Sequence, residues 1–163
     1  DAASGKLDSL EQDSSLTDEQ RKQVEDMKNK LQSAKDSAQQ QQENEQKKSE
    51  RRQEFSSEMD ELESDDLKIS SAANAEDELA MTASSFEQWD ELLSEMYDYL
   101  AGVLNADQYA SEEENYKQWV AERDSGAENA ASETEDSTQK QLASYSFKQS
   151  YTKARCYKLL DMM

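Results

Sequence analysis

The sequence has no histidine and no proline, and only three glycines and one cysteine among its 163 residues. Without histidine, imidazole-based acid and base catalysis, His-ligated metal sites and pH sensing near neutrality are excluded. A single cysteine excludes an internal disulfide and a zinc site built from several thiolates. Three Val and one Ile are too few β-branched aliphatic residues to build a sheet. We therefore expect an all-α fold.

Large apolar residues are scarce and unevenly distributed. Leu, Ile, Val and Phe make up 21 residues, a level typical of disordered chains when the net charge is as high as −20. Counting Val, Ile, Leu, Met, Phe, Trp, Tyr and Cys, residues 1–78 hold 11 such side chains and residues 79–163 hold 26. The core is therefore expected in a domain over 79–163, which a polar helical arm over 17–78 precedes.

The N-terminal half offers little to bury. Residues 1–16 are small, polar and aperiodic, which is typical of a flexible tether. The segment 17–20, Thr-Asp-Glu-Gln, fits a capping box that opens a helix. No apolar residue occurs in 39–54, so that stretch can be helical but not buried. Whether the arm is one helix or two with a break stays open. An apolar stripe follows, and we expect it to dock on the C-terminal domain: Phe55, Met59 and Leu62.

Apolar residues in the C-terminal half recur at the three- and four-residue spacing of amphipathic helices. A first helix is expected to be capped by Ser84 or Ser85 and to end near Asn105. A second is expected to begin after Ser111, and a third to run to the chain end. The prediction is a small helical bundle with a long polar N-terminal helical arm. Its expected core includes Trp89, Leu93, Met96, Leu100, Trp119, Leu142 and Leu159.

One segment of the second helix is distinctive. Residues 119–124 read Trp-Val-Ala-Glu-Arg-Asp, an aromatic anchor one turn before an Arg-Asp pair. The first helix also has Asp, Leu and Tyr at a characteristic spacing, and the chain closes with Thr-x-x-Arg-x-x-x-Leu. Together these segments resemble the lysozyme-inhibitor LprI-like N-terminal domain family over about residues 85–163. The residues that carry the resemblance are Asp90, Leu93, Tyr97, Trp119, Arg123, Asp124, Thr152, Arg155 and Leu159.

This resemblance implies a small exported helical domain of bacteria, whose partner is lysozyme or another cationic cell-wall-active protein. Family members often carry Cys soon after the Arg-Asp pair and before the Thr-x-x-Arg. This chain has Ser125-Gly126 and the Cys-free segment 145–150 at those places, and Cys156 lies elsewhere. The departure affects any activity that depends on a disulfide-fixed loop, whereas the helical fold is still expected.

We interpret the motif residues as structural. Arg123 lies one helical turn beyond Trp119, so its stem can cover the indole while its guanidinium pairs with Asp90 or another acid of the first core helix. Arg155 is expected beside Asp90 or Asp124. Cys156 falls on the apolar stripe and is expected to be a small buried hydrophobe. The tyrosines are expected to pack in the core and at its edge.

The charge bears on the partners. An acidic chain is repelled by the phosphates of nucleic acids and by anionic lipid, so neither is expected as a partner. A cationic protein is favoured, and an acidic loop on a rigid helical base would suit it. We expect no cofactor, no metal site and no catalytic residue, and hence no enzyme. The candidate partner-binding residues of the loop are Glu133, Glu135 and Asp136.

The chain starts at Asp1 rather than Met, which is compatible with a processed N-terminus and a removed export signal. No window approaches the roughly 18 to 20 apolar residues of a membrane span. We expect an extracellular or cell-surface protein, with a lipid anchor before Asp1 as its one route to a membrane. The alternative is a structural or interaction protein, whose arm spaces the bundle from the envelope or self-associates.

Overall fold

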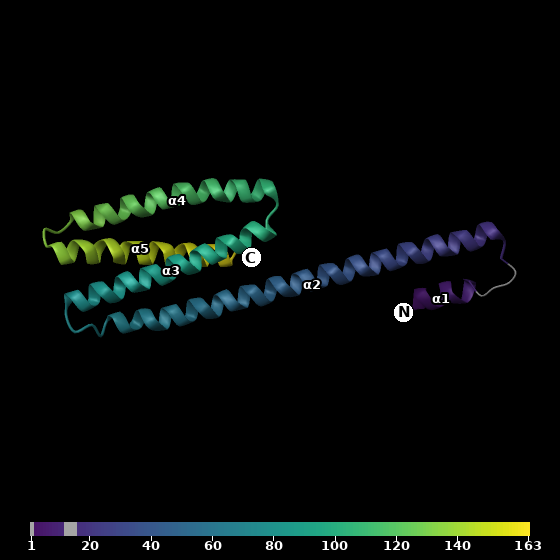
Figure 1. The fold of residues 1–163 in the computed structure, drawn as a ribbon, viewed down its shortest axis with the longest axis horizontal. Helices are drawn as coiled ribbons and strands as arrows, with labels where there is room; N and C mark the ends of the chain where they lie inside the picture. Colours follow the sequence, from purple (N-terminus) through teal and green to yellow (C-terminus); the bar gives the residue numbers. More distant parts are fainter. Residues whose placement is uncertain (1, 12–15) are drawn as a thin grey trace. The chain divides into compact units, whose positions relative to one another are not determined.

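A computed structural model describes residues 2–11 and 16–163 (Figure 1). These residues contain no strand, which confirms the all-α fold class. The chain divides into two compact units, residues 1–49 and 50–163, and each is described by itself. The helices are α1 (Ala2–Glu11), α2 (Asp18–Ile69), α3 (Ala75–Val103), α4 (Ala106–Ser132) and α5 (Ser137–Leu160).

The first unit contains a helix where the sequence indicated a flexible tether. Helix α1 lies along α2, with Lys28 Nζ 2.7 Å from Asp8 Oδ1 and Lys35 Nζ donating to Ser4 Oγ at 2.6 Å. These contacts join residues far apart in sequence, so no local pattern predicts them. Residues 1 and 12–15, also assigned to the tether, lie outside the described residues.

The arm is one helix rather than two. Helix α2 begins at Asp18, within the predicted capping box. There the backbone N–H of Gln20 donates to Thr17 Oγ1 at 3.3 Å and that of Thr17 donates to Gln20 Oε1 at 2.9 Å. The side chains over 36–47 are all exposed, and most of this stretch lies in the segment 39–54, which has no apolar residue. The compact C-terminal unit spans residues 50–163, so it includes the last part of α2.

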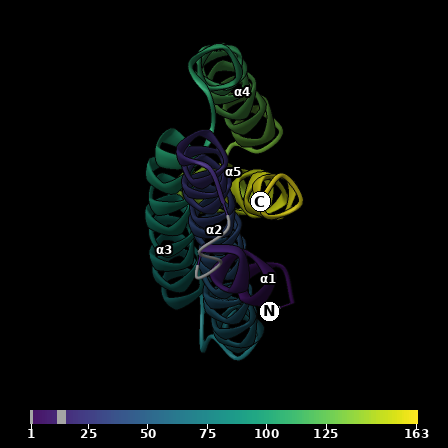
Figure 2. The ribbon, with the colours of Figure 1, turned by 90° about the vertical axis from the view of Figure 1, so that its right-hand side faces the viewer.

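Residues 50–163 form a helical bundle around one apolar core. Helix α5 packs against both α3 and α4 (Figure 2). The predicted docking of the α2 stripe is confirmed, because Phe55 and Met59 are fully buried in the core and Leu62 packs against it. Leu142 was expected in the core but is only partly buried. The core consists of Phe55, Met59, Trp89, Leu92, Leu93, Met96, Leu100, Trp119, Cys156 and Leu159.

Two helices begin earlier than the sequence indicated. Helix α3 is capped by Asn74, whose side chain accepts from the backbone N–H groups of Glu76 and Asp77, and not by Ser84 or Ser85. Helix α4 begins at Ala106, not after Ser111. An Asn-x-x-Gln capping box, Asn105 with Gln108, opens it immediately after α3 ends.

A partly buried polar cluster around Asp66 ties the end of α2 to the bundle. Asp66 accepts a hydrogen bond from the Trp89 indole at 3.1 Å and one from the Gln149 amide at 2.8 Å, and it also accepts one from the Ser85 hydroxyl. Lys153 Nζ lies 3.6 Å from its second oxygen. One carboxylate therefore joins α2, α3 and α5.

Charge is segregated among the helices of the bundle. Helix α5 carries five Lys and Arg and no acid, whereas α3 carries eight acids and no Lys or Arg. The cations of α5 pair with carboxylates of the helices around it: Lys148 with Asp124 at 3.9 Å, and Lys153 with Glu63 at 2.8 Å. Electrostatic complementarity therefore supports the placement of α5, in addition to its apolar contacts.

Candidate functional site

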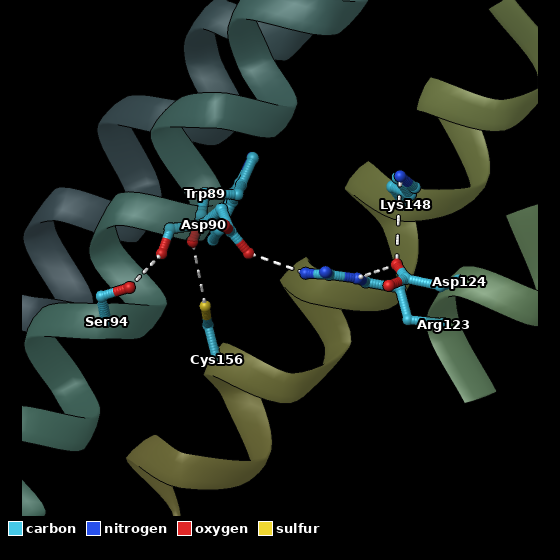
Figure 3. A network of polar contacts seen from close by, with 7 residues as sticks. All are labelled: Trp89, Asp90, Ser94, Arg123, Asp124, Lys148 and Cys156. Atoms are coloured by element: carbon cyan, nitrogen blue, oxygen red, sulfur yellow. Dashed lines mark hydrogen bonds and ion pairs between the residues drawn. The ribbon is translucent and has the colours of Figure 1, made fainter. Parts of the chain in front are cut away.

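The motif residues of α4 and α3 meet in one polar network (Figure 3). Arg123 Nη1 lies 2.8 Å from Asp90 Oδ1 and Arg123 Nε lies 3.1 Å from Asp124 Oδ1. Lys148 Nζ approaches the same oxygen of Asp124 at 3.9 Å. The Arg123 side chain is 11% exposed and Trp119 is buried. The predicted pair between Arg123 and Asp90 is confirmed.

Two aromatic rings complete the surroundings of Arg123. Its guanidinium carbon lies 5.0 Å from the centre of the Trp119 ring and 5.5 Å from that of Phe86. These distances allow cation–π attraction, which adds to the two ion pairs. The guanidinium is therefore held from several sides, as expected of a group that fixes helices α3 and α4 relative to each other.

The second motif arginine has a different partner from the one predicted. Arg155 forms a buried ion pair with Glu112 and its Nε donates to the Tyr97 hydroxyl at 2.8 Å, so the expectation of Asp90 or Asp124 was wrong. The early start of α4 places Glu112 inside the bundle, where it faces α5. Burial is the main cause that raises the pKa of Tyr97 above its ordinary value.

The remaining motif residues are packed in the interior. Leu93, Thr152 and Leu159 have almost no exposed surface. The thiol of Cys156 is likewise buried, and it lies 3.8 Å from the backbone oxygen of Trp89 (Figure 3). Burial raises the pKa of the Cys156 thiol to about 12. The prediction of a small buried hydrophobe at Cys156 is confirmed.

A family model described as lysozyme inhibitor LprI matches residues 69–159. This chain belongs to the lysozyme inhibitor LprI family. The match begins at the last residue of α2, ends within α5 and includes every motif residue described above. No curated protein and no solved structure matches the chain. Within the described residues, no helix is long and apolar enough to cross a membrane, and no group of His, Cys, Asp and Glu could hold a metal ion.

Noncovalent contacts join the two segments at which the LprI resemblance would place cysteines. A Cβ added at Gly126 would come within 2.2 Å of the Phe147 ring, so α4 and α5 approach closely at this point. Phe147 stacks on Tyr151 with ring centres 5.5 Å apart, and the Lys148–Asp124 contact lies beside it. Ring packing and an ion pair therefore hold together segments that contain no cysteine here.

The acidic loop between α4 and α5 is exposed, but two of its residues cap the adjacent helices. Asp136 caps α5 by accepting from the backbone N–H of Gln139 at 2.9 Å, and Glu133 is the C-cap of α4. Glu135 lies 3.9 Å from Lys140. Of the three loop residues predicted to bind a partner, Glu133 therefore has the side chain that the bundle uses least, because it caps α4 through its backbone N–H.

A second acidic surface lies on α3 of this LprI bundle, and it was not predicted from the sequence. The carboxylates of Glu87, Glu91 and Asp98 are exposed and recur at helical spacing along one side of α3. None of the three forms an ion pair within the bundle. Glu95, on the same helix, lies 3.2 Å from Arg51 of α2 and is partly neutralised. The absence of Lys and Arg from α3 is the sequence signal for this surface.

Proposed function

We propose that this protein binds and inhibits a lysozyme-type cell-wall hydrolase, and that it does so outside the cell or on the cell surface. Membership in the LprI family carries the proposal, because inhibition of lysozyme is the activity that the family description names. The Trp119, Arg123 and Arg155 side chains support the fold on which a binding surface is displayed. They are too buried to form the surface that would contact a protein as large as lysozyme.

The distribution of charge supports a cationic partner. Residues 50–163 contain 27 of the 38 acids and 10 of the 18 basic residues, so −17 of the −20 net charge lies in the bundle. Attraction over distance raises the rate at which a cationic protein finds such a surface. The exposed side of α3, with Glu87, Glu91 and Asp98, is the part of the bundle that we assign to this contact.

The test is inhibition of lysozyme in a turbidity assay, at low and at physiological salt. Exposed charges are screened over about 8 to 10 Å in physiological salt, so a nonspecific encounter fades while a specific interface keeps a saturable, stoichiometric component. We expect saturable inhibition at both salt concentrations. An unrelated acidic helical protein of equal charge that inhibits equally would overturn the proposal.

A matched pair of variants locates the surface. Replacing the three carboxylates of α3 (Glu87→Gln, Glu91→Gln, Asp98→Asn) should weaken inhibition at least about tenfold, a loss of roughly 1.4 kcal/mol in binding. The control removes the same charge from the exposed start of α2 (Glu19→Gln, Glu25→Gln, Asp26→Asn) and should change inhibition by less than about twofold. Equal losses in both variants would show that net charge alone matters, and would remove α3 from the proposal.

A second role is favoured by the polar stretch of α2. The continuous exposure of residues 36–47 suits a spacer between the bundle and the cell envelope, or a segment that self-associates. Sedimentation of the full chain distinguishes these two uses, because self-association makes the apparent mass depend on concentration. If the protein is a monomer at all concentrations and does not inhibit lysozyme, the spacer role would replace the inhibitor role.

A further inference from the structure

A groove of about 410 Å³ runs between α4 and α5. Its α4 wall carries Gln118, Trp119 and Glu122, and its α5 wall carries Tyr151, Arg155 and Lys158. The volume falls in the range of about 300 to 1,000 Å³ that is typical of small-molecule sites. The groove lies within the second compact unit, and the function proposed above does not use it.

Lys158, at the edge of this groove, is unusual among the cations of the bundle. Residues 50–163 contain ten Lys and Arg side chains, and nine of them form ion pairs with carboxylates of the bundle. Lys158 is the exception within these residues, and it is exposed. A lysine that remains unpaired among 27 carboxylates leaves a positive charge available to a ligand.

Arg155 adds a second cationic donor three residues away on the same face of α5. Its Nε donates to Tyr97 and its Nη2 to Glu112, which leaves Nη1 without a hydrogen bond to the residues of the bundle. The side chain is 5% exposed, lines the groove and cannot reorient without breaking its buried pair. A guanidinium fixed in this way suits a carboxylate, because its donors point in set directions.

The opposite wall offers groups that recognise hydroxyls. Gln118 Nε2 donates to Glu122 Oε1 at 2.9 Å, and the Tyr151 hydroxyl donates to Glu122 Oε2 at 3.0 Å. Each Glu122 oxygen keeps a free lone pair, and the Gln118 amide oxygen accepts as well. Trp119 and Tyr151 stack with ring centres 5.7 Å apart and contribute apolar surface. Acceptors and aromatic edges together match a compact, hydroxyl-rich molecule.

The geometry points to the α4–α5 groove as a binding site for a small, hydroxyl-rich carboxylate of the sugar-acid class. Its carboxylate is bound by Arg155 Nη1 and Lys158 Nζ, and its hydroxyls face Gln118 and Glu122. The groove thus combines the one cation of residues 50–163 that has no ion pair with an arginine whose Nη1 is not hydrogen-bonded. This site does not require a lysozyme partner and stands whether or not the protein inhibits one.

The test is titration of the full chain with glucuronate, followed by amide chemical shifts in NMR spectra. We expect saturable shifts confined to the facing turns of α4 and α5. Glucose, which lacks the carboxylate, and acetate, which lacks the hydroxyls, should each bind at least about tenfold more weakly. Absence of saturation by glucuronate overturns the proposal, and so does equal affinity for glucose or acetate.

Two variants with the same change of charge locate the site. Lys158→Glu should weaken glucuronate binding at least about tenfold, because it replaces the unpaired cation at the groove. Lys140→Glu changes a lysine of the same helix that lies outside the groove and pairs with Glu135, and it should leave the affinity within about twofold. Equal weakening by both would assign the effect to net charge and overturn the site.

Discussion

Arg123 Nη1 on α4 lies 2.8 Å from Asp90 Oδ1 on α3, and the two side chains are unequally exposed, 11% for Arg123 and 42% for Asp90. Loss of Asp90 leaves a largely buried cation with Asp124 as its remaining carboxylate partner. Loss of Arg123 leaves a carboxylate that water can reach. The two halves of the pair therefore differ in what their removal costs.

We predict that Asp90→Asn lowers the free energy of unfolding by about 1 to 3 kcal/mol, measured by urea denaturation. Arg123→Met should cost less, because its unbranched stem still covers Trp119. The double variant should cost less than the sum of the single variants. Strict additivity would mean that the pair does not couple α3 and α4. If Arg123→Met abolished lysozyme inhibition but left stability unchanged, Arg123 would be a residue that contacts the partner and not a structural one.

We predict a larger loss of stability when the buried pair of Arg155 and Glu112 is broken. Both side chains are at most 7% exposed, so removing one leaves an unpaired charge inside the bundle. Glu112→Ala should lower the free energy of unfolding by about 3 to 5 kcal/mol. Replacing both residues by apolar ones, Glu112→Leu with Arg155→Met, should recover much of that loss. Thermal denaturation of the single and double variants measures this, and a double variant less stable than Glu112→Ala would contradict it.

The sequence predicted features that depend on spacing along one helix. Apolar residues at three- and four-residue intervals located α3, α4 and α5, and the docking of Phe55 and Met59 followed from the stripe they form. The Arg123–Asp90 pair could be predicted because Trp119 and Arg123 lie on one face of their helix. These inferences require only that a helix buries its apolar side, which holds before any tertiary contact is known.

Features that depend on contacts between helices were missed for physical reasons. Glu112 is followed by Glu113 and Glu114, a pattern typical of the exposed first turn of a helix. It is instead the seventh residue of α4 and faces α5, because the Asn105 box opens the helix earlier. Asp66 lies in a Ser-Asp-Asp run that indicates a weakened helix, yet it accepts hydrogen bonds from two other helices. Because Glu112 and Asp66 are charged, a search for apolar core positions does not select either of them.

Glu63 provides a prediction for acid stability. Hydrogen bonds from Lys153, at 2.8 Å, and from the Tyr157 hydroxyl, at 2.7 Å, lower the pKa of Glu63 below its ordinary value of 4.5. A carboxyl with a lower pKa in the folded state stabilises the fold above its unfolded pKa. That stabilisation is lost as the pH falls through the folded pKa.

We therefore expect Glu63→Gln to lose less stability than the parent chain between about pH 5 and pH 3, although it is less stable at neutral pH. The control is Glu61→Gln, two residues away on α2, because Glu61 is exposed and forms no ion pair within the bundle. Its pH dependence should follow that of the parent chain. Urea denaturation at several pH values measures both, and parallel curves for all three proteins would contradict the assignment to Glu63.

Helices α4 and α5 approach closely at Gly126, so the effect of Gly126→Ala on stability should depend on whether the Phe147 ring is present. An alanine Cβ at Gly126 would come within 2.2 Å of the Phe147 ring, which stacks on Tyr151 and must leave that stack to make room. Alanine in a helix interior otherwise gains about 1 kcal/mol over glycine. Gly126→Ala should therefore destabilise the parent chain but stabilise a Phe147→Ala background by about 1 kcal/mol. Thermal denaturation of the four proteins tests this, and stabilisation by Gly126→Ala in the parent chain would show that the Phe147 ring moves aside without cost.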